Sequence, residues 1–114
     1  LCKPIKDESV ITKSVNSSFI GTDLKDILDQ MNCNTVVIVG LTTDHCVSTT
    51  TRMAGNFGYD TYLISDATAT FDKLGQNGEI FESELIHKTA LASLDNEFAT
   101  VISSTDLFKM LIKA

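Results

Sequence analysis

The fold is decided by residues 36–47, which read VVIVGLTTDHCV. The first four are β-branched apolar residues in an unbroken run, which is typical of a parallel strand buried on both faces. Gly40 ends this run, and Thr43 or Asp44 can cap a helix that begins near Cys46. The unpaired N–H groups and the positive dipole end of such a helix point at its first residues, where a thiol becomes nucleophilic. The stretch therefore predicts a reactive cysteine in the first turn of a helix that follows a buried strand.

Strand and helix patterns alternate along the rest of the chain. We expect strands over residues 10–13, 35–40, 59–65 and 99–103. We expect helices over residues 22–31, 46–56 and 79–94, a loop over residues 66–71, and a last helix capped by Thr105. Strict alternation of this kind predicts right-handed crossovers, a parallel sheet and helices on both of its faces, which is a three-layer α/β fold.

The length of the chain bounds the number of domains. Its 114 residues, 43% of them hydrophobic, suffice for one compact domain with a modest core. A doubly wound sheet usually has about five or six strands, and the pattern supplies about four. We therefore expect residues 1–114 to form a single domain that is incomplete at its N-terminal side.

Charge and cysteine content exclude several classes of function. The formal net charge of -6, without any basic run, argues against binding to nucleic-acid backbones, which requires clustered Lys and Arg. No apolar stretch approaches the roughly 18 residues of a membrane span, and the first residues lack signal-peptide character. The three cysteines, Cys2, Cys33 and Cys46, form no C-x-x-C pair, which disfavours a disulfide framework or a zinc site. We expect a cytoplasmic protein with reduced thiols and a small-molecule partner.

Short motifs follow one another along nearly the whole chain. They are VITK at residues 10–13, NSSF at 16–19, GTDL at 21–24, VGLTTDHCV at 39–47, GY at 58–59, SDA at 65–67, and His87 ahead of Ala90 and Leu91. In this order and spacing they resemble the isochorismatase-like cysteine hydrolases, a superfamily that includes nicotinamidases, N-carbamoylsarcosine amidase and ureidoacrylate or biuret amidohydrolases. The resemblance implies a three-layer α-β-α domain that here lacks its N-terminal strand, and a homo-oligomer.

The resemblance also implies a catalytic triad of Asp, Lys and Cys. Cys46 corresponds to the nucleophile and Lys13 to the triad lysine. The family's aspartate ends a strand upstream of the lysine strand, and no residue of this chain matches it. The metal ligands of the nicotinamidase branch lie in the same upstream part, so the sequence identifies no cofactor and leaves a divalent metal open.

What the resemblance implies for the reaction is hydrolysis of a small amide, ureido or carbamoyl compound through a thioester with Cys46. The oxyanion would be held by the backbone N–H groups of Thr42 and Cys46, with a cis peptide between Leu41 and Thr42. Lys13 would keep the carboxylate ionised and add positive potential beside the sulfur. We expect the substrate pocket to include Phe19, Leu41, His45 and Phe71.

Several of these residues have simpler interpretations. Composition alone predicts a solvated surface lysine at Lys13, and Asp44 is most simply a helix cap. Asp66 sits at the carboxyl edge of the sheet, where structural support of the loops is favoured over direct catalysis. His87 is expected to be a surface histidine or one with its hydrogen bonds satisfied.

Two other functions compete with the hydrolase. The chain can be a noncatalytic interaction or structural module, because the triad aspartate is absent from it. A thiol-based redox protein using Cys46 is the weaker alternative, because no resolving cysteine lies nearby in the sequence.

Overall fold

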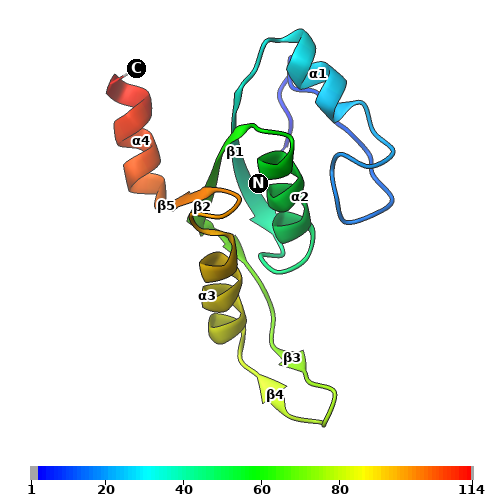
Figure 1. Cartoon of the computed structure of the whole chain (residues 1–114), viewed down its shortest axis with the longest axis vertical. Helices are drawn as coiled ribbons and strands as arrows, with labels where there is room; N and C mark the ends of the chain where they lie inside the picture. Colours follow the sequence, from blue (N-terminus) through cyan, green and yellow to red (C-terminus); the bar gives the residue numbers. More distant parts are fainter. Residues whose placement is uncertain (1–2, 114) are drawn as a thin grey trace.

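A computed structural model describes residues 3–113 of the chain. Helices and strands alternate along it (Figure 1). Their bounds, in chain order, are α1 (Leu24–Gln30), β1 (Thr35–Leu41), α2 (Cys46–Asn56), β2 (Asp60–Ala69), β3 (Lys73–Leu74), β4 (Ile80–Phe81), α3 (Ser83–Leu94), β5 (Thr100–Ile102) and α4 (Ser104–Lys113). The predicted α/β class with a parallel sheet is confirmed.

The main sheet has three parallel strands in the order β1-β2-β5. Ile38 pairs with Leu63, and Leu63 pairs with Val101, so these side chains form one row on the same face. The core lies on this face, where Val47 of α2 and Leu94 of α3 pack against the fully buried Leu63. α2 and α3 also contact each other, whereas α4 stands on the other side of the sheet from α2 (Figure 1).

The register of the β1–β2 pair changes near the end of β1, and this change sets which residues of β2 lie beside Gly40 and Leu41. Ile38 pairs with Leu63, but two residues later Gly40 pairs with Thr68. The extra residues of β2 bulge out of the ladder, and pairing then resumes as far as Leu41 and Ala69. β2 is consequently longer than the predicted strand and includes residues 66–69 of the predicted loop over residues 66–71.

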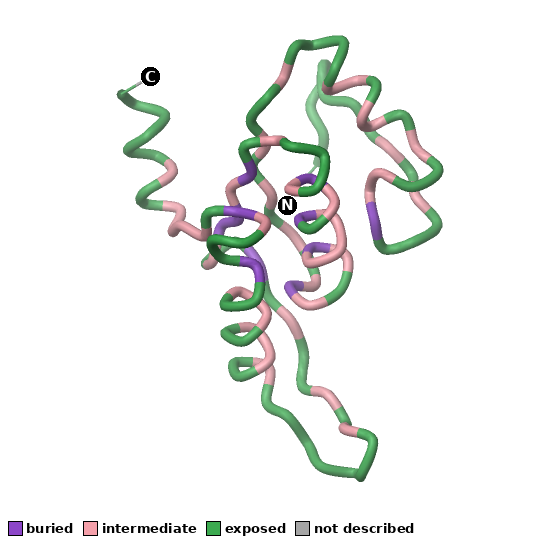
Figure 2. Tube along the Cα trace, in the orientation of Figure 1, coloured by how far each residue is buried: buried purple, intermediate pink, exposed green. Residues whose placement is uncertain are grey.

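The prediction that β1 is buried on both faces is wrong. Alternate residues face away from the core, and Val37, Val39 and Leu41 are 45%, 56% and 62% exposed. Among the β1 residues, Ile38 is the one that packs against the core cluster of the described chain. Figure 2 shows buried positions concentrated along β2, α2 and the end of α3, with exposed positions along α4 and the β3–β4 arm.

The predicted strand over residues 10–13 is not formed. These residues are extended but pair with no strand of the described chain, and Val10 is 73% exposed. A strand is defined by its partner, and an apolar stretch without one remains an irregular segment. The loop that follows residues 10–13 lies close to α2, because the Ser18 N–H donates to Thr50 Oγ1 over 3.0 Å.

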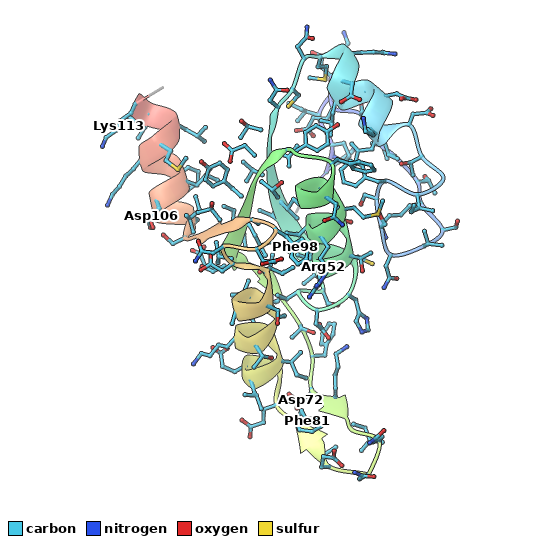
Figure 3. All side chains as sticks on the ribbon, viewed as in Figure 1. Arg52, Asp72, Phe81, Phe98, Asp106 and Lys113 are labelled. Carbon is cyan, nitrogen blue, oxygen red and sulfur yellow. The ribbon has the colours of Figure 1, made fainter. Side chains whose placement is uncertain are left out.

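An antiparallel arm, formed by β3 and β4, takes the place of the first residues of the predicted third helix. β3 and β4 pair through Lys73 with Phe81 and Leu74 with Ile80, and they project away from the sheet (Figure 1). α3 therefore begins at Ser83 rather than near residue 79. Figure 3 shows the Asp72 and Phe81 side chains on the arm, where the Ser83 N–H donates to Asp72 Oδ1 over 2.8 Å.

The last helix differs from its prediction in its cap. Ser103 Oγ accepts a hydrogen bond from the Asp106 N–H over 3.1 Å, so Ser103 rather than Thr105 caps α4. The apolar side of α4 is largely exposed, with Phe108 at 59% and Leu111 at 59%. Among the helices of residues 3–113, none has the length and apolar character needed to cross a membrane.

We assign to Leu63 a large contribution to stability, because it lies at the centre of the core cluster. Leu63→Ala should lower the free energy of unfolding by about 2–5 kcal/mol, because Leu63 is fully buried and its loss leaves a cavity. Leu74→Ala is the matched control, since Leu74 also lies in a strand but is 71% exposed, and its effect should stay within about 0.5 kcal/mol. Urea unfolding monitored by circular dichroism measures both. Equal effects of the two substitutions would contradict this assignment.

Candidate active site

Cys46 is the first residue of α2 and is half-buried. The helix position matches the prediction, but its predicted capping does not. His45 is the N-cap residue, and it makes no side-chain capping bond. The Thr43 hydroxyl and the Asp44 carboxylate are used elsewhere, by His87 and by Thr70 with Lys73. Neither Thr43 nor Asp44 therefore caps α2.

Lys13 and Cys46 meet, although they are far apart in the sequence. Lys13 Nζ donates to Cys46 Sγ over 3.3 Å and to the Val15 carbonyl over 3.0 Å. The lysine is half-buried and comes from the irregular segment, not from a strand. Within residues 3–113, no carboxylate forms a hydrogen bond or ion pair with Lys13 or Cys46.

The peptide bond between Leu41 and Thr42 is cis, as the resemblance implied. In the turn that follows, the Thr42 carbonyl accepts from the N–H groups of His45 over 3.1 Å and Val47 over 3.3 Å. The N–H groups of Thr42 and Cys46 donate to no other protein group in the described part of the chain. Two free N–H groups beside a cysteine are the kind of donors that an oxyanion requires.

A cavity of about 220 Å³ lies beside the Cys46 sulfur. Leu41 is the predicted pocket residue that lines this cavity, and the predicted catalytic residues Lys13 and Cys46 also line it. It is lined by Lys13, Ser18, Ile38, Val39, Gly40, Leu41, Cys46, Val47 and Thr50. A larger hollow of about 500 Å³ lies between the end of β2 and α3 and includes neither Lys13 nor Cys46. We place the candidate site at the smaller cavity, because it contains the thiol.

The other predicted pocket residues lie away from this cavity. Phe19 packs edge-on against Phe57, with ring centroids 5.2 Å apart, and lines a separate apolar cavity beside β1 and α1. His45 is exposed and faces Lys73, with 2.9 Å between its Nε2 and Lys73 Nζ. Phe71 is 67% exposed and does not line the cavity at Cys46.

Asp44 forms a polar cluster next to the candidate site. Its carboxylate accepts from Thr70 Oγ1 over 2.6 Å and lies 2.8 Å from Lys73 Nζ. Burial opposes the ionisation of Asp44, but the hydrogen bonds from Lys73 and Thr70 outweigh it and hold the pKa of the carboxyl below its usual value. The cluster ties the turn before Cys46 to the base of the β3–β4 arm. Sequence reasoning missed Lys73, because no local pattern marks a lysine that pairs across 29 residues of chain.

Asp66 and His87 connect β2 to neighbouring segments. Asp66 accepts hydrogen bonds from the Ser104 hydroxyl and from the Ser104 N–H, and these bonds lower the pKa of its carboxyl. His87 lies between the buried Thr43 and the middle of β2, with Nδ1 2.8 Å from Thr43 Oγ1 and Nε2 3.0 Å from the Ser65 carbonyl oxygen. Both ring nitrogens of His87 therefore have hydrogen-bond partners, as expected for a histidine with satisfied hydrogen bonds.

Comparison with known proteins gives the family. A model of the isochorismatase domain matches residues 2–106, which is most of the chain. The chain belongs to the isochorismatase family. It is 54% identical to the isochorismatase family protein YrdC of Bacillus subtilis over 113 residues, covering 99% of this chain and 60% of that protein. It is 28% identical to Nicotinamidase 3 of Arabidopsis thaliana, covering 92% of this chain and 48% of that protein.

A solved structure shares the fold of this isochorismatase-family chain. The crystal structure of a putative hydrolase of the isochorismatase family from Chromobacterium violaceum superposes with a TM-score of 0.95 at 37% identity, and the match covers 98% of this chain and 58% of that one. The chain thus spans about half to three-fifths of the length of these relatives.

The isochorismatase-family chain has two free cysteines in its described part, Cys33 and Cys46. Cys2 lies outside the described residues. Within residues 3–113, no three His, Cys, Asp or Glu side chains are grouped closely enough to hold a metal ion. The groups that the described residues place at the candidate site are the Cys46 thiol, the Lys13 ammonium group and the free backbone N–H groups.

Asp44→Asn should flatten the acid side of the stability–pH curve. The folded pKa of Asp44 is lowered, so its ionised form stabilises the fold above the unfolded value of about 3.9, and this contribution is lost as the pH falls through the folded pKa. Urea unfolding at pH 7 and pH 3 measures the change. Lys73→Met is the matched variant, because it keeps the carboxyl and removes its ion-pair partner. The folded pKa of Asp44 should then rise toward the unfolded value, so this variant should also lose less stability between pH 7 and pH 3. An unchanged pH dependence in Asp44→Asn would contradict the role of the cluster.

Proposed function

We propose that this protein is a cysteine-dependent hydrolase that acts on a small amide, ureido or carbamoyl compound. The observation that carries the proposal is the contact of 3.3 Å between Lys13 Nζ and Cys46 Sγ beside two unpaired backbone N–H groups. Membership of the isochorismatase family supports hydrolase chemistry. The similarity to a nicotinamidase of Arabidopsis thaliana favours an amide over other substrates.

The proposed reaction begins with attack of the Cys46 sulfur on the substrate carbonyl carbon. Negative charge develops on the carbonyl oxygen, and the N–H groups of Thr42 and Cys46 donate to it. Collapse of this intermediate breaks the C–N bond, a proton passes to the leaving nitrogen, and an acyl group remains on the sulfur as a thioester. Water then adds to the thioester, gives up a proton, and releases the carboxylic or carbamic product and the thiolate.

Lys13 has two tasks in this proposal. Its ammonium group lies 3.3 Å from the sulfur and places a positive charge beside the attacking atom. It would also hold a carboxylate that moves protons between the thiol, the leaving nitrogen and water. Among residues 3–113, no carboxylate contacts Lys13 or Cys46. We propose that the carboxylate belongs to a segment equivalent to the part of the relatives that this chain does not match.

The second candidate is a noncatalytic module. It is favoured by one observation, which is that no carboxylate lies at the Lys13–Cys46 pair within residues 3–113. A module of this kind would keep the turn and the cysteine but would not turn over substrate.

Alkylation by iodoacetamide tests the lysine. At pH 7, Lys13→Met should slow the labelling of Cys46 by about tenfold, because it removes the cation beside the sulfur. Lys109→Met is the control, since Lys109 is an exposed lysine of α4, and it should leave the rate unchanged. Peptide mass spectrometry follows Cys46 and Cys33 separately. If Cys46 reacts no faster than Cys33 in the unaltered protein, the thiol is not activated.

Turnover separates the two candidate functions. We expect the protein to release ammonia from at least one member of a panel of primary amides, ureido acids and carbamoyl amino acids, among them nicotinamide. Cys46→Ala should abolish this release, because the nucleophile is lost. An intact-mass measurement after rapid quenching should detect the acyl group on Cys46. Absence of turnover across the panel, with Cys46 nevertheless reactive, would favour the noncatalytic module.

A further inference from the structure

Thr43 is the most buried residue of the turn that leads to Cys46. It is fully buried, and it lies between the two residues whose N–H groups are free. Its own N–H donates to the Ala69 carbonyl at the end of β2 over 3.0 Å. The Thr43 side chain is therefore buried, it does not line the cavity at Cys46, and its hydroxyl needs a hydrogen-bond partner inside the protein.

His87 supplies that partner and is itself fixed. Its Nδ1 lies 2.8 Å from Thr43 Oγ1, and its Nε2 lies 3.0 Å from the Ser65 carbonyl oxygen. A carbonyl oxygen only accepts, so Nε2 carries a proton. In the neutral ring Nδ1 then accepts, and the Thr43 hydroxyl donates to it. One tautomer of His87 thus satisfies both contacts.

We propose that His87 is the positioning residue for the oxyanion-binding turn, and that it acts through Thr43. This inference rests on the proposed function, in which the Thr42 and Cys46 N–H groups receive the oxyanion. The imidazole connects α3, the middle of β2 at Ser65 and the turn, so the turn has a side-chain anchor in addition to the Thr43 N–H bond to Ala69. His87 touches neither the sulfur nor the cavity at Cys46.

The proposal has a specific kinetic consequence. Oxyanion donors act on charge that develops only in the transition state, so a displaced turn slows reactions that form an oxyanion. Reactions of the same sulfur that form no oxyanion are spared. A general loss of structure would slow both kinds of reaction. Loss of a positioning residue would slow only the reaction that forms an oxyanion.

Two reagents provide this comparison without knowledge of the substrate. With p-nitrophenyl acetate, the Cys46 sulfur adds to the ester carbonyl, an oxyanion forms, and the C–O bond breaks to leave an acetyl thioester and p-nitrophenolate. With iodoacetamide, the sulfur displaces iodide from a methylene carbon, and no oxyanion forms. The first rate is read from p-nitrophenolate absorbance, the second from peptide mass spectrometry, and Cys46→Ala gives the background.

We expect His87→Leu to slow acetylation of Cys46 by about 10- to 100-fold and to leave alkylation within about twofold of the unaltered protein. Thr43→Val, which removes the hydroxyl and keeps the shape, should reproduce this split. His87→Gln should restore most of the acetylation rate, because its amide offers one acceptor and one donor to the same partners. Thr89→Val is the control, since Thr89 is an exposed threonine of α3, and it should change neither rate.

The outcomes distinguish the inference from the function on which it rests. Acetylation of the unaltered protein no faster than that of Cys46→Ala would overturn the proposed function, and the inference with it. Acetylation that is rapid and unchanged in both His87→Leu and Thr43→Val would overturn the inference alone, as would equal slowing with both reagents. Nitrogen NMR of the neutral His87 ring gives a test independent of reactivity. A proton on Nε2 supports the inference, and a proton on Nδ1 contradicts it.

Discussion

The end of β2 holds the turn between β1 and α2, and the candidate site depends on this pairing. β1 and β2 pair again after the change of register, so that Leu41 lies beside Ala69. The Thr43 N–H then donates to the Ala69 carbonyl, which extends the ladder into the turn. Without this second stretch of pairing, the chain after Gly40 would be an unsupported loop, and its N–H groups would have no fixed direction. The bulge in β2 is therefore part of how the site is built.

Two lysines flank the turn, and their surroundings give them different roles. Lys73 lies 2.8 Å from the Asp44 carboxylate, which balances its charge and attaches the β3–β4 arm to the turn. Lys13 has no carboxylate partner in the described part of the chain, and its contacts are the Val15 carbonyl and the Cys46 sulfur. The positive potential at the sulfur consequently comes from Lys13 and the first turn of α2, whereas Lys73 has a structural role.

The sequence predicted those helices and strands whose hydrophobic pattern is visible within a single segment. The strand at residues 35–40 and the helix at residues 46–56 were found because an apolar run and a helical repeat are visible within one segment. The β3–β4 arm was missed, because two paired residues on each side leave almost no pattern in the sequence. The contacts of Lys73 with Asp44 and of His87 with Thr43 were also missed, since they join segments that only the folded sheet brings together. Lys13 and Cys46 were paired through family resemblance, and no spacing rule would have linked them.

The two residues of the reactive pair differ in structural support, because Lys13 lies in an irregular segment and Cys46 begins a helix. Cys46 begins a helix whose next residue, Val47, belongs to the core, so its position is lost only when the core itself unfolds. Residues 3–23 contain no helix or strand and share few backbone hydrogen bonds with the rest of the described chain. Segments of this kind open locally at a free energy below that of global unfolding. We therefore expect the contact between Lys13 and the sulfur to open at a lower free energy than the core, with faster hydrogen exchange on the lysine side of the site.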